Sequence, residues 1–188
     1  MADIQYNFIN LPSRIEFENG HVISYLYDAD GIKLRTTHII GSDTTVTDYC
    51  GNVIYENGIP VKLLTEAGYV TLADSKYHYF VQDHLGNNRV VVDQSGNVEE
   101  VNHYYPFGGL LSSSVSNAVQ PYKYNGKELD RKNGLDWYDY GARMYDAALG
   151  RWHAVDPMSE KYYSWSPYTY CKNNPVLRID LDGKDDYV

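Results

Sequence analysis

Cysteine is nearly absent from this chain, which has only Cys50 and Cys171 among its 188 residues. The two lie far apart and form neither a metal-binding nor a redox motif. We therefore expect two buried free thiols. The alternative is one long-range disulfide between them, which would need an oxidising compartment.

Positive charge is also scarce, since 16 Lys and Arg stand against 25 Asp and Glu and give a net charge of -9. An acidic chain without a basic cluster repels phosphate backbones, so nucleic acid is not an expected partner. No apolar run approaches the length of a membrane span. The first residues, MADIQYNFINLPSR, lack the charged-then-apolar profile of a signal peptide, so the sequence leaves the compartment unknown.

Phenylalanine is rare, with 4 copies, whereas tyrosine occurs 20 times. The ring and hydroxyl of tyrosine suit strands with one wet face. Tyr25 and Tyr27 alternate along one predicted strand, and Tyr77 and Tyr79 along another, so we expect cross-strand aromatic ladders. These windows lack the i, i+3, i+4 apolar spacing of a helix.

Glycine divides the first part of the chain into similar units, at intervals of about ten residues, a spacing typical of all-β folds. Asn19-Gly20 and Asn57-Gly58 predict two-residue hairpin turns, in which both central residues need positive φ. The units form an imperfect internal repeat, and a repeat has to stack on its neighbours. The predicted fold class is mainly β, an antiparallel hairpin ribbon that is either a small sheet or a piece of something larger.

A Ser-rich segment at residues 110–121 gives the best internal boundary. We predict a β-hairpin region over 1–109 and a second domain over 122–188. In the second domain, Tyr138, Tyr140, Ala142 and Met144 are predicted to share one face of a strand.

The end of the second domain carries further local signals. Residues 147–150 are predicted to form a turn, and 151–155 the returning strand. A short helix is predicted over 167–171, with Ser166 as N-cap and proline at its first position.

Two long stretches of this second domain have a familiar pattern. YNGKELDRKNGLDWYDYGARMYDAALGRWHAVDP, followed by SPYTYCKNNPVLRIDLDG, resembles the RHS repeat-associated core domain, which closes the long YD-repeat proteins of bacteria. The segment SRIEFENGHVISYLYDADGIKL is similar to a YD repeat, with Tyr27-Asp28 and Gly31 in the expected places. The resemblance implies a hairpin ribbon that spirals into a hollow shell around a C-terminal effector, often a toxin. In this family the core domain plugs one end, and members are commonly exported or surface-exposed.

The resemblance also implies a chemical site. Two carboxylates that share one proton can hydrolyse a peptide bond. The family pattern places this pair at Asp156 and Asp180, with Arg151 holding a carboxylate. It places self-cleavage between Gly183 and Lys184. We expect no metal and no cofactor.

The chain departs from that pattern at both motifs. The first reads Asp-Pro-Met-Ser-Glu and lacks the usual Gly-Leu, while the second has Leu for Pro and Lys for the usual Leu at the cut. Only residues 184–188 follow the cut, so no effector is expected. The preferred interpretation is an end-capping and encapsulating module, in which the aspartates cap turns and Arg151 braces one of them. The alternative is an aspartyl-type autoprotease acting once on its own chain.

The chain is expected to self-associate or to dock onto a longer YD-repeat protein, because Met1 falls almost within a repeat and leaves a sheet edge exposed. Other sites are weaker predictions: a calcium turn, a histidine metal site and a serine nucleophile. The calcium turn would use Asp180, Asp182 and Asp185, and the histidine site His78, His84 and His103. The serine nucleophile would come from residues 112–114. Tyrosine faces could also stack sugars, as in an adhesin.

Overall fold

The computed structural model describes residues 3–112, 114–116 and 120–187. The chain divides into two compact units, Met1–Tyr79 and Phe80–Val188. Each unit is described by itself. The predicted division at the Ser-rich segment stays a prediction, and residues 113 and 117–119 of that segment lie outside the described residues.

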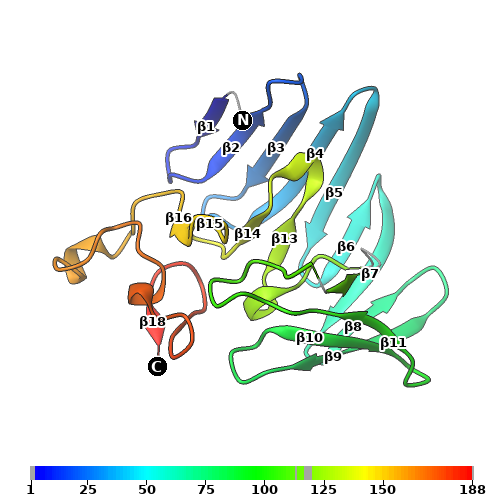
Figure 1. Ribbon diagram of the computed structural model, residues 1–188. Helices are drawn as coiled ribbons and strands as arrows, with labels where there is room; N and C mark the ends of the chain where they lie inside the picture. Colours follow the sequence, from blue (N-terminus) through cyan, green and yellow to red (C-terminus); the bar gives the residue numbers. More distant parts are fainter. Residues whose placement is uncertain (1–2, 113, 117–119, 188) are drawn as a thin grey trace. The chain divides into compact units, whose positions relative to one another are not determined.

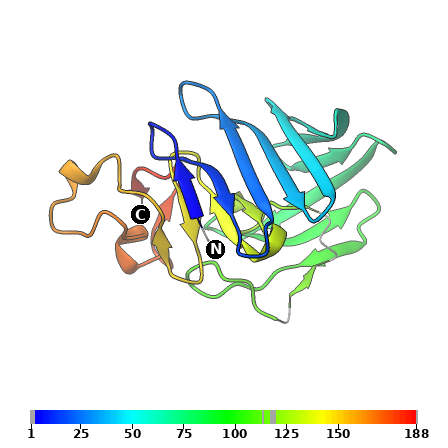
Figure 2. The ribbon, with the colours of Figure 1, turned by 90° about the horizontal axis from the view of Figure 1, so that it is seen from above.

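The first unit is a meander in which each strand pairs antiparallel with the next along the chain (Figures 1 and 2). Its last strand, β9, continues into the second unit. The strands are β1 (Asp3–Tyr6), β2 (Pro12–Glu16), β3 (Val22–Tyr27), β4 (Lys33–Ile40), β5 (Asp43–Cys50), β6 (Val53–Glu56), β7 (Ile59–Thr65), β8 (Gly68–Thr71) and β9 (Lys76–Gln82). The predicted antiparallel hairpin ribbon is therefore confirmed.

The two Asn-Gly pairs form different turns. Asn57 and Gly58 have φ of 51° and 79°, so β6 and β7 are joined by the predicted two-residue turn. At the other pair, Gly20 has φ 80° and donates its N–H to the Phe17 carbonyl at 2.9 Å, while Asn19 is not left-handed. The β2–β3 loop is therefore one residue longer than predicted, with residues 18–20 between Phe17 and His21 and a left-handed glycine at its end.

The aspartate of the Tyr27-Asp28 pair begins an Asp-x-x-Gly turn that recurs along the chain. Asp28 Oδ1 accepts the N–H groups of Asp30 and Ile32 at 2.9 and 2.8 Å, and Gly31 takes φ 85°. Asp83 and Asp93 cap their own turns through the same two contacts. The carboxylate thus satisfies turn N–H groups that the strands leave unpaired.

Side chains of the first unit follow the predicted two-residue period. Ile15 and Ile23 lie opposite each other on β2 and β3 and are fully buried. Tyr77 and Tyr79 share a face of β9, but it is the exposed one. His78 between them is buried and stacks on Tyr69, with ring centroids 4.4 Å apart. The ladder predicted there is therefore a histidine–tyrosine stack on the opposite face.

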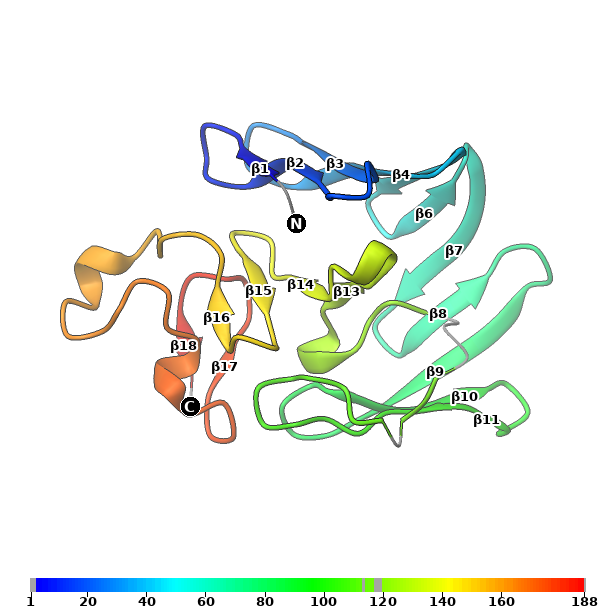
Figure 3. The ribbon, with the colours of Figure 1, turned by 45° about the horizontal axis from the view of Figure 1, so that its top comes forward.

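The second unit contains three groups of short antiparallel strands, visible in Figure 3. Among its described residues the helical segments are single 3₁₀ turns. The strands are β10 (Asn88–Asp93), β11 (Val98–Val101) and β12 (Val115–Ser116); β13 (Glu128–Asp130), β14 (Trp137–Asp139), β15 (Met144–Asp146) and β16 (Arg151–Trp152); and β17 (Ile179–Asp180) and β18 (Asp186–Tyr187). The 3₁₀ turns are η1 (Tyr124–Gly126), η2 (Lys132–Gly134), η3 (Ser159–Lys161) and η4 (Cys171–Asn173).

Two local predictions in the second unit need correction. The strand predicted through Tyr138 and Met144 is a hairpin, in which Asp139 of β14 pairs with Met144 of β15. Gly141, with φ 90°, lies in the connection and ends the alternation. The predicted turn at 147–150 is confirmed. The returning strand is present but shorter than the predicted 151–155, since β16 spans only Arg151–Trp152.

The short helix predicted over 167–171 lies later, at η4, where all three residues have positive φ. Tyr170, directly before η4, is fully buried. Thr169 forms a β-bridge with Arg151. The bridge and the buried ring together hold residues 169 and 170 in an extended conformation, which excludes a helix there.

Tyrosine hydroxyls connect the core of the second unit to one turn. The buried rings of Tyr124, Tyr138 and Tyr145 pack in one aromatic cluster with Trp152 and Tyr170. The first three donate their hydroxyl protons to the carbonyl oxygens of residues 106–108 at 2.8–2.9 Å. A buried phenol needs such an acceptor, so the carbonyls of the turn at 106–108 fix the position of each ring.

Both cysteines are free thiols. Cys171 is buried, and burial raises the pKa of its thiol to about 12. Cys50 is exposed, which corrects the prediction of two buried thiols. Among the described residues, no helix is long and apolar enough to cross a membrane.

Candidate functional site

Both predicted aspartates cap turns in the second unit. Asp156 follows β16, and its Oδ1 accepts the Met158 N–H at 2.7 Å. Asp180 ends β17, and its Oδ1 accepts the N–H groups of Asp182 and Gly183 at 3.1 and 2.6 Å. Each carboxylate has its other oxygen, Oδ2, directed to a shared cation.

That cation is Arg143, which precedes β15 and is 2% exposed. Its Nη1 lies 3.4 Å from Asp156 Oδ2, and its Nη2 lies 3.7 Å from Asp180 Oδ2. Its Nε donates to the Gly183 carbonyl oxygen at 2.6 Å. Its guanidinium carbon lies 4.2 Å from the centre of the Trp152 ring, a cation–π contact. One buried guanidinium thus holds both aspartates and the carbonyl of the predicted cleavage position.

Arg151, the arginine predicted from the sequence, lies elsewhere. It is exposed, and its Nη1 donates to Thr169 Oγ1 at 3.1 Å. Because strand side chains alternate, β16 turns Trp152 into the core and Arg151 outward. In the structure Arg143 therefore makes the carboxylate contacts that the sequence assigned to Arg151.

Sequence reasoning missed Arg143 because it placed Tyr138 to Met144 on one continuous strand. The tight connection at Gly141 instead buries Arg143, Met144 and Tyr145 in succession. The available signal was an arginine inside an aromatic and apolar stretch, Tyr-Gly-Ala-Arg-Met-Tyr. A buried arginine requires acidic partners, and they come from distant turns.

The charges of this site do not balance, since two carboxylates face one guanidinium. Burial raises the pKa of Asp180 to about 6, although the N–H groups of Gly183 and Asp182 and the charge of Arg143 lower it. Burial also lowers the pKa of Arg143, and Asp156 and Asp180 oppose that shift. Asp180 therefore binds a proton far more readily than an exposed aspartate.

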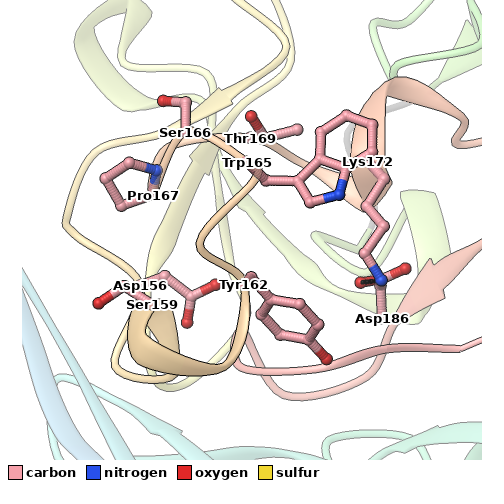
Figure 4. Close-up of a pocket in the computed structure, with 9 residues that line it drawn as sticks. All are labelled: Asp156, Ser159, Tyr162, Trp165, Ser166, Pro167, Thr169, Lys172 and Asp186. Atoms are coloured by element: carbon pink, nitrogen blue, oxygen red, sulfur yellow. Dashed lines mark ion pairs between the residues drawn. The ribbon is translucent and has the colours of Figure 1, made fainter.

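A small cavity adjoins Asp156 (Figure 4). It encloses about 20 Å³, enough for one water molecule. Tyr162, Trp165 and Lys172 line it, and Lys172 Nζ pairs with Asp186 Oδ1 at 3.1 Å. The site therefore has room for a water molecule next to one carboxylate.

The predicted cleavage position lies in a constrained turn. Gly183 is buried and has φ 79°, and a Cβ at this position would come 2.9 Å from the Arg143 backbone nitrogen. The Ala142 N–H donates to the Asp182 carbonyl at 3.0 Å. Lys184, the next residue, is exposed, so the bond between them passes from the core to the surface.

Several residues of the weaker predicted sites make other contacts in the structure. Asp185 accepts from Lys161 Nζ at 2.9 Å and from the Tyr162 hydroxyl at 2.5 Å, and Asp180 belongs to the Arg143 site. His78 stacks on Tyr69. Within the described ranges, no group of three or more His, Cys, Asp or Glu is arranged to hold a metal ion.

The fold and the site define a class: a Tyr-Asp hairpin ribbon followed by a tyrosine-rich end segment. Residues 63–176, more than half of the chain, match the model of the Teneurin YD-shell family. The chain belongs to that family.

Curated relatives come from insects and bacteria. The salivary gland surface protein 1 of Aedes aegypti is 32% identical over 197 residues, covering 92% of this chain and 6% of that protein. Toxin subunit YenC1 of Yersinia entomophaga is 29% identical over 154 residues, covering 73% of this chain and 15% of that protein. The chain thus spans a small part of these relatives.

Solved structures share the fold. A crystal structure of TcdB2-TccC3-TEV aligns with a TM-score of 0.80 at 19% identity, covering 96% of this chain and 10% of that one. TcdB2-TccC3-Cdc42 aligns with a TM-score of 0.81 at 20% identity, covering 97% and 10%. The chain is therefore a module of YD-shell architecture.

Proposed function

We propose that this chain closes an end of a YD-repeat shell and encapsulates, rather than acting on a succession of substrates. The observation that carries this proposal is the contact set of Arg143, which joins the turns of Asp156 and Asp180 to the Gly183 carbonyl. These contacts fix the last segment of the chain onto the aromatic core. Such a fixed, tyrosine-sealed end suits a closing element.

The bracing role is tested by replacing Arg143 with methionine, an unbranched side chain that is shorter than arginine and lacks its charge and its hydrogen-bond donors. Two buried carboxylates then lose their cation, and we expect the free energy of unfolding to fall by about 3–5 kcal/mol. The matched control is Arg151→Met, an exposed arginine, with an expected change within about 0.5 kcal/mol. Equal effects of the two variants in urea unfolding would contradict the bracing role.

Association with a longer YD-repeat protein, or with a second copy, is proposed to use β1. In the described part of the sheet, β1 is the first strand and pairs with β2. A strand with one side open can accept another strand. Light scattering of the full chain should show concentration-dependent dimers, and Gln5→Pro should weaken them because proline disrupts strand pairing.

Phe8→Ser is the control for this experiment, because Phe8 is 87% exposed next to β1 and its loss tests non-specific apolar contact instead. Association that follows Phe8 rather than Gln5 contradicts edge pairing. A monomer at every concentration contradicts self-association.

The second candidate function is a single self-cleavage after Gly183. Two observations favour it: Arg143 Nε already contacts the Gly183 carbonyl oxygen, and a water-sized cavity adjoins Asp156. Asp156 would take a proton from water as the water attacks the carbonyl carbon, and Arg143 would stabilise the oxyanion. A protonated Asp180 would supply the proton to the departing Lys184 nitrogen.

Intact mass spectrometry tests the cleavage directly. The purified chain, held at pH 5 and at pH 8, should lose residues 184–188 faster at pH 5, because Asp180, with a pKa of about 6, is then protonated. Asp156→Asn and Asp180→Asn should abolish the loss, whereas Asp30→Asn, at an exposed aspartate of the turn between β3 and β4, should not. A full-length mass at both pH values rejects self-cleavage and leaves the capping proposal standing.

A further inference from the structure

A second buried polar cluster lies in the second unit, outside the Arg143 site. Glu100 of β11 and Asn102 just after it are fully buried, and Lys123, before η1, is 3% exposed. Lys123 Nζ lies 2.5 Å from Glu100 Oε1. Asn102 Nδ2 donates to the same oxygen atom, and Gln120 Nε2 donates to it at 3.0 Å.

This cluster is a poor structural ion pair. Removing a lysine and a glutamate from water is costly unless every remaining polar atom is hydrogen-bonded. Glu100 Oε2 and Asn102 Oδ1 are buried, and within the described residues neither has a hydrogen-bond partner. Unpaired buried acceptors lower the contribution of this ion pair to stability and call for an explanation.

The three side chains instead suit a covalent reaction. A lysine becomes a nucleophile once an adjacent base takes its proton, and Glu100 Oε1 lies beside Lys123 Nζ in the position of such a base. The Asn102 amide is held in place, because Nδ2 also donates to the Asn88 carbonyl at 3.0 Å. Both nitrogens contact one oxygen of Glu100, so a single carboxylate reaches the attacking atom and the leaving atom.

We propose that Lys123 and Asn102 become joined by an intramolecular isopeptide bond, with Glu100 as the proton carrier. Glu100 Oε1 takes a proton from the Lys123 ammonium, and the neutral Nζ attacks Asn102 Cγ. The Nζ–Cγ bond forms and the Cγ–Nδ2 bond breaks. Glu100 gives its proton to Nδ2, which leaves as ammonia, and takes the second proton from Nζ. That proton then passes to solvent, so the step needs neither oxidant nor reductant.

The bond would be a covalent cross-link, here called the strap, within the second unit. It would join the end of the β11 hairpin to the segment that enters η1, and would close a loop that contains the Ser-rich residues 110–121. A cross-link that closes a loop restricts the unfolded chain. Such a strap is independent of the Arg143 site and of any cleavage after Gly183.

The intact mass of the full chain tests the proposal. The wild-type protein should be lighter than its sequence by one ammonia. Glu100→Gln and Lys123→Arg should each have the full mass of their sequence, and Lys132→Arg, at an exposed lysine, should keep the loss. A wild-type protein of full mass overturns the proposal whether or not the variants fold. Loss of residues 184–188 is a separate, much larger change, so the two processes are read independently.

Peptide mapping identifies the bond itself. Chymotrypsin cleaves after tyrosine and phenylalanine between residues 102 and 123, so the denatured, digested protein should yield a branched peptide joining Asn102 to Lys123. Ammonia lost at an Asn-Gly pair, or a branch at Gln120, would contradict the assignment. Loss of water, which indicates a bond between Lys123 and Glu100, would contradict it as well.

Discussion

At the scale of single residues, the excess of tyrosine over phenylalanine follows from the hydroxyl. Tyr138 is 1% exposed, and its hydroxyl donates to the Gly108 carbonyl at 2.9 Å. Tyr138→Phe keeps the ring and leaves that carbonyl unpaired, so the free energy of unfolding in urea should fall by about 1 kcal/mol. Tyr163, 89% exposed, is the control, and Tyr163→Phe should leave stability unchanged. Equal stability of Tyr138→Phe and wild type would show that the ring alone is sufficient.

The raised pKa of Asp180 gives a second prediction at this scale. Its folded pKa of about 6 exceeds the usual unfolded value of roughly 3.9, so the folded state binds the proton more tightly. This group's contribution is therefore fully present below pH 4 and is lost as the pH rises through 6. Asp180→Asn keeps an oxygen for the turn N–H groups and leaves Arg143 with one carboxylate.

The difference in unfolding free energy between Asp180→Asn and wild type should therefore grow in favour of the variant from pH 4 to pH 7, by roughly 3 kcal/mol at most. Urea unfolding of both proteins at each pH measures this difference. Histidines titrate in both proteins alike, so their effect on stability cancels when the two free energies are subtracted. A variant that loses stability at pH 7 would mean that the Asp180–Arg143 attraction exceeds the cost of burying a second carboxylate.

At the scale of elements, the turn at Gly183 is constrained in two ways: the glycine backbone is left-handed, and it packs closely against Arg143. Gly183 has φ 79°, and a Cβ there would lie 2.9 Å from the Arg143 nitrogen. Gly96 has φ 85° in an Asp-x-x-Gly turn, with nothing within 4 Å of its Cβ position. Both Gly→Ala changes carry the left-handed cost of about 1–2 kcal/mol, but Gly183→Ala should cost clearly more. Thermal unfolding compares them, and equal losses would mean that the Gly183 turn relaxes freely.

Local elements could be predicted because their causes are local. Asn57 and Gly58 tolerate positive φ and form the predicted tight turn. The same dipeptide at Asn19-Gly20 forms a longer loop, because Phe17 pairs with His21 across the turn. The dipeptide thus predicts a reversal of the chain, whereas the register of the flanking strands decides its length.

The site could be predicted only in part. The turns of Asp156 and Asp180 have local signals in proline, glycine and aspartate, and each carboxylate does cap its turn. Which arginine lies between them depends on the Gly141 connection, because this connection determines which side chains of the following residues are buried. Buried ion pairs join residues distant in sequence, so periodicity on one strand does not locate them.

At the scale of the whole molecule, the Ser-rich segment 110–121 is proposed as a boundary along the sequence. Hydrogen bonds nevertheless connect the residues around this boundary in space. His103 N–H donates to Ser114 Oγ at 3.0 Å, and Tyr145 on the far side donates to the Phe107 carbonyl. Limited proteolysis of the Lys123→Arg chain, which cannot form the proposed bond to Asn102, should cut near Ser112, which is exposed, while the two pieces stay together in size-exclusion chromatography. In this Lys123→Arg background, Tyr145→Phe removes one bridging bond and should make the cut protein separate at a lower urea concentration than cut Lys123→Arg alone, whereas Tyr163→Phe should not. Pieces that separate without denaturant would mean that 1–109 and 122–188 are independent domains, and would remove the basis for a sealed end.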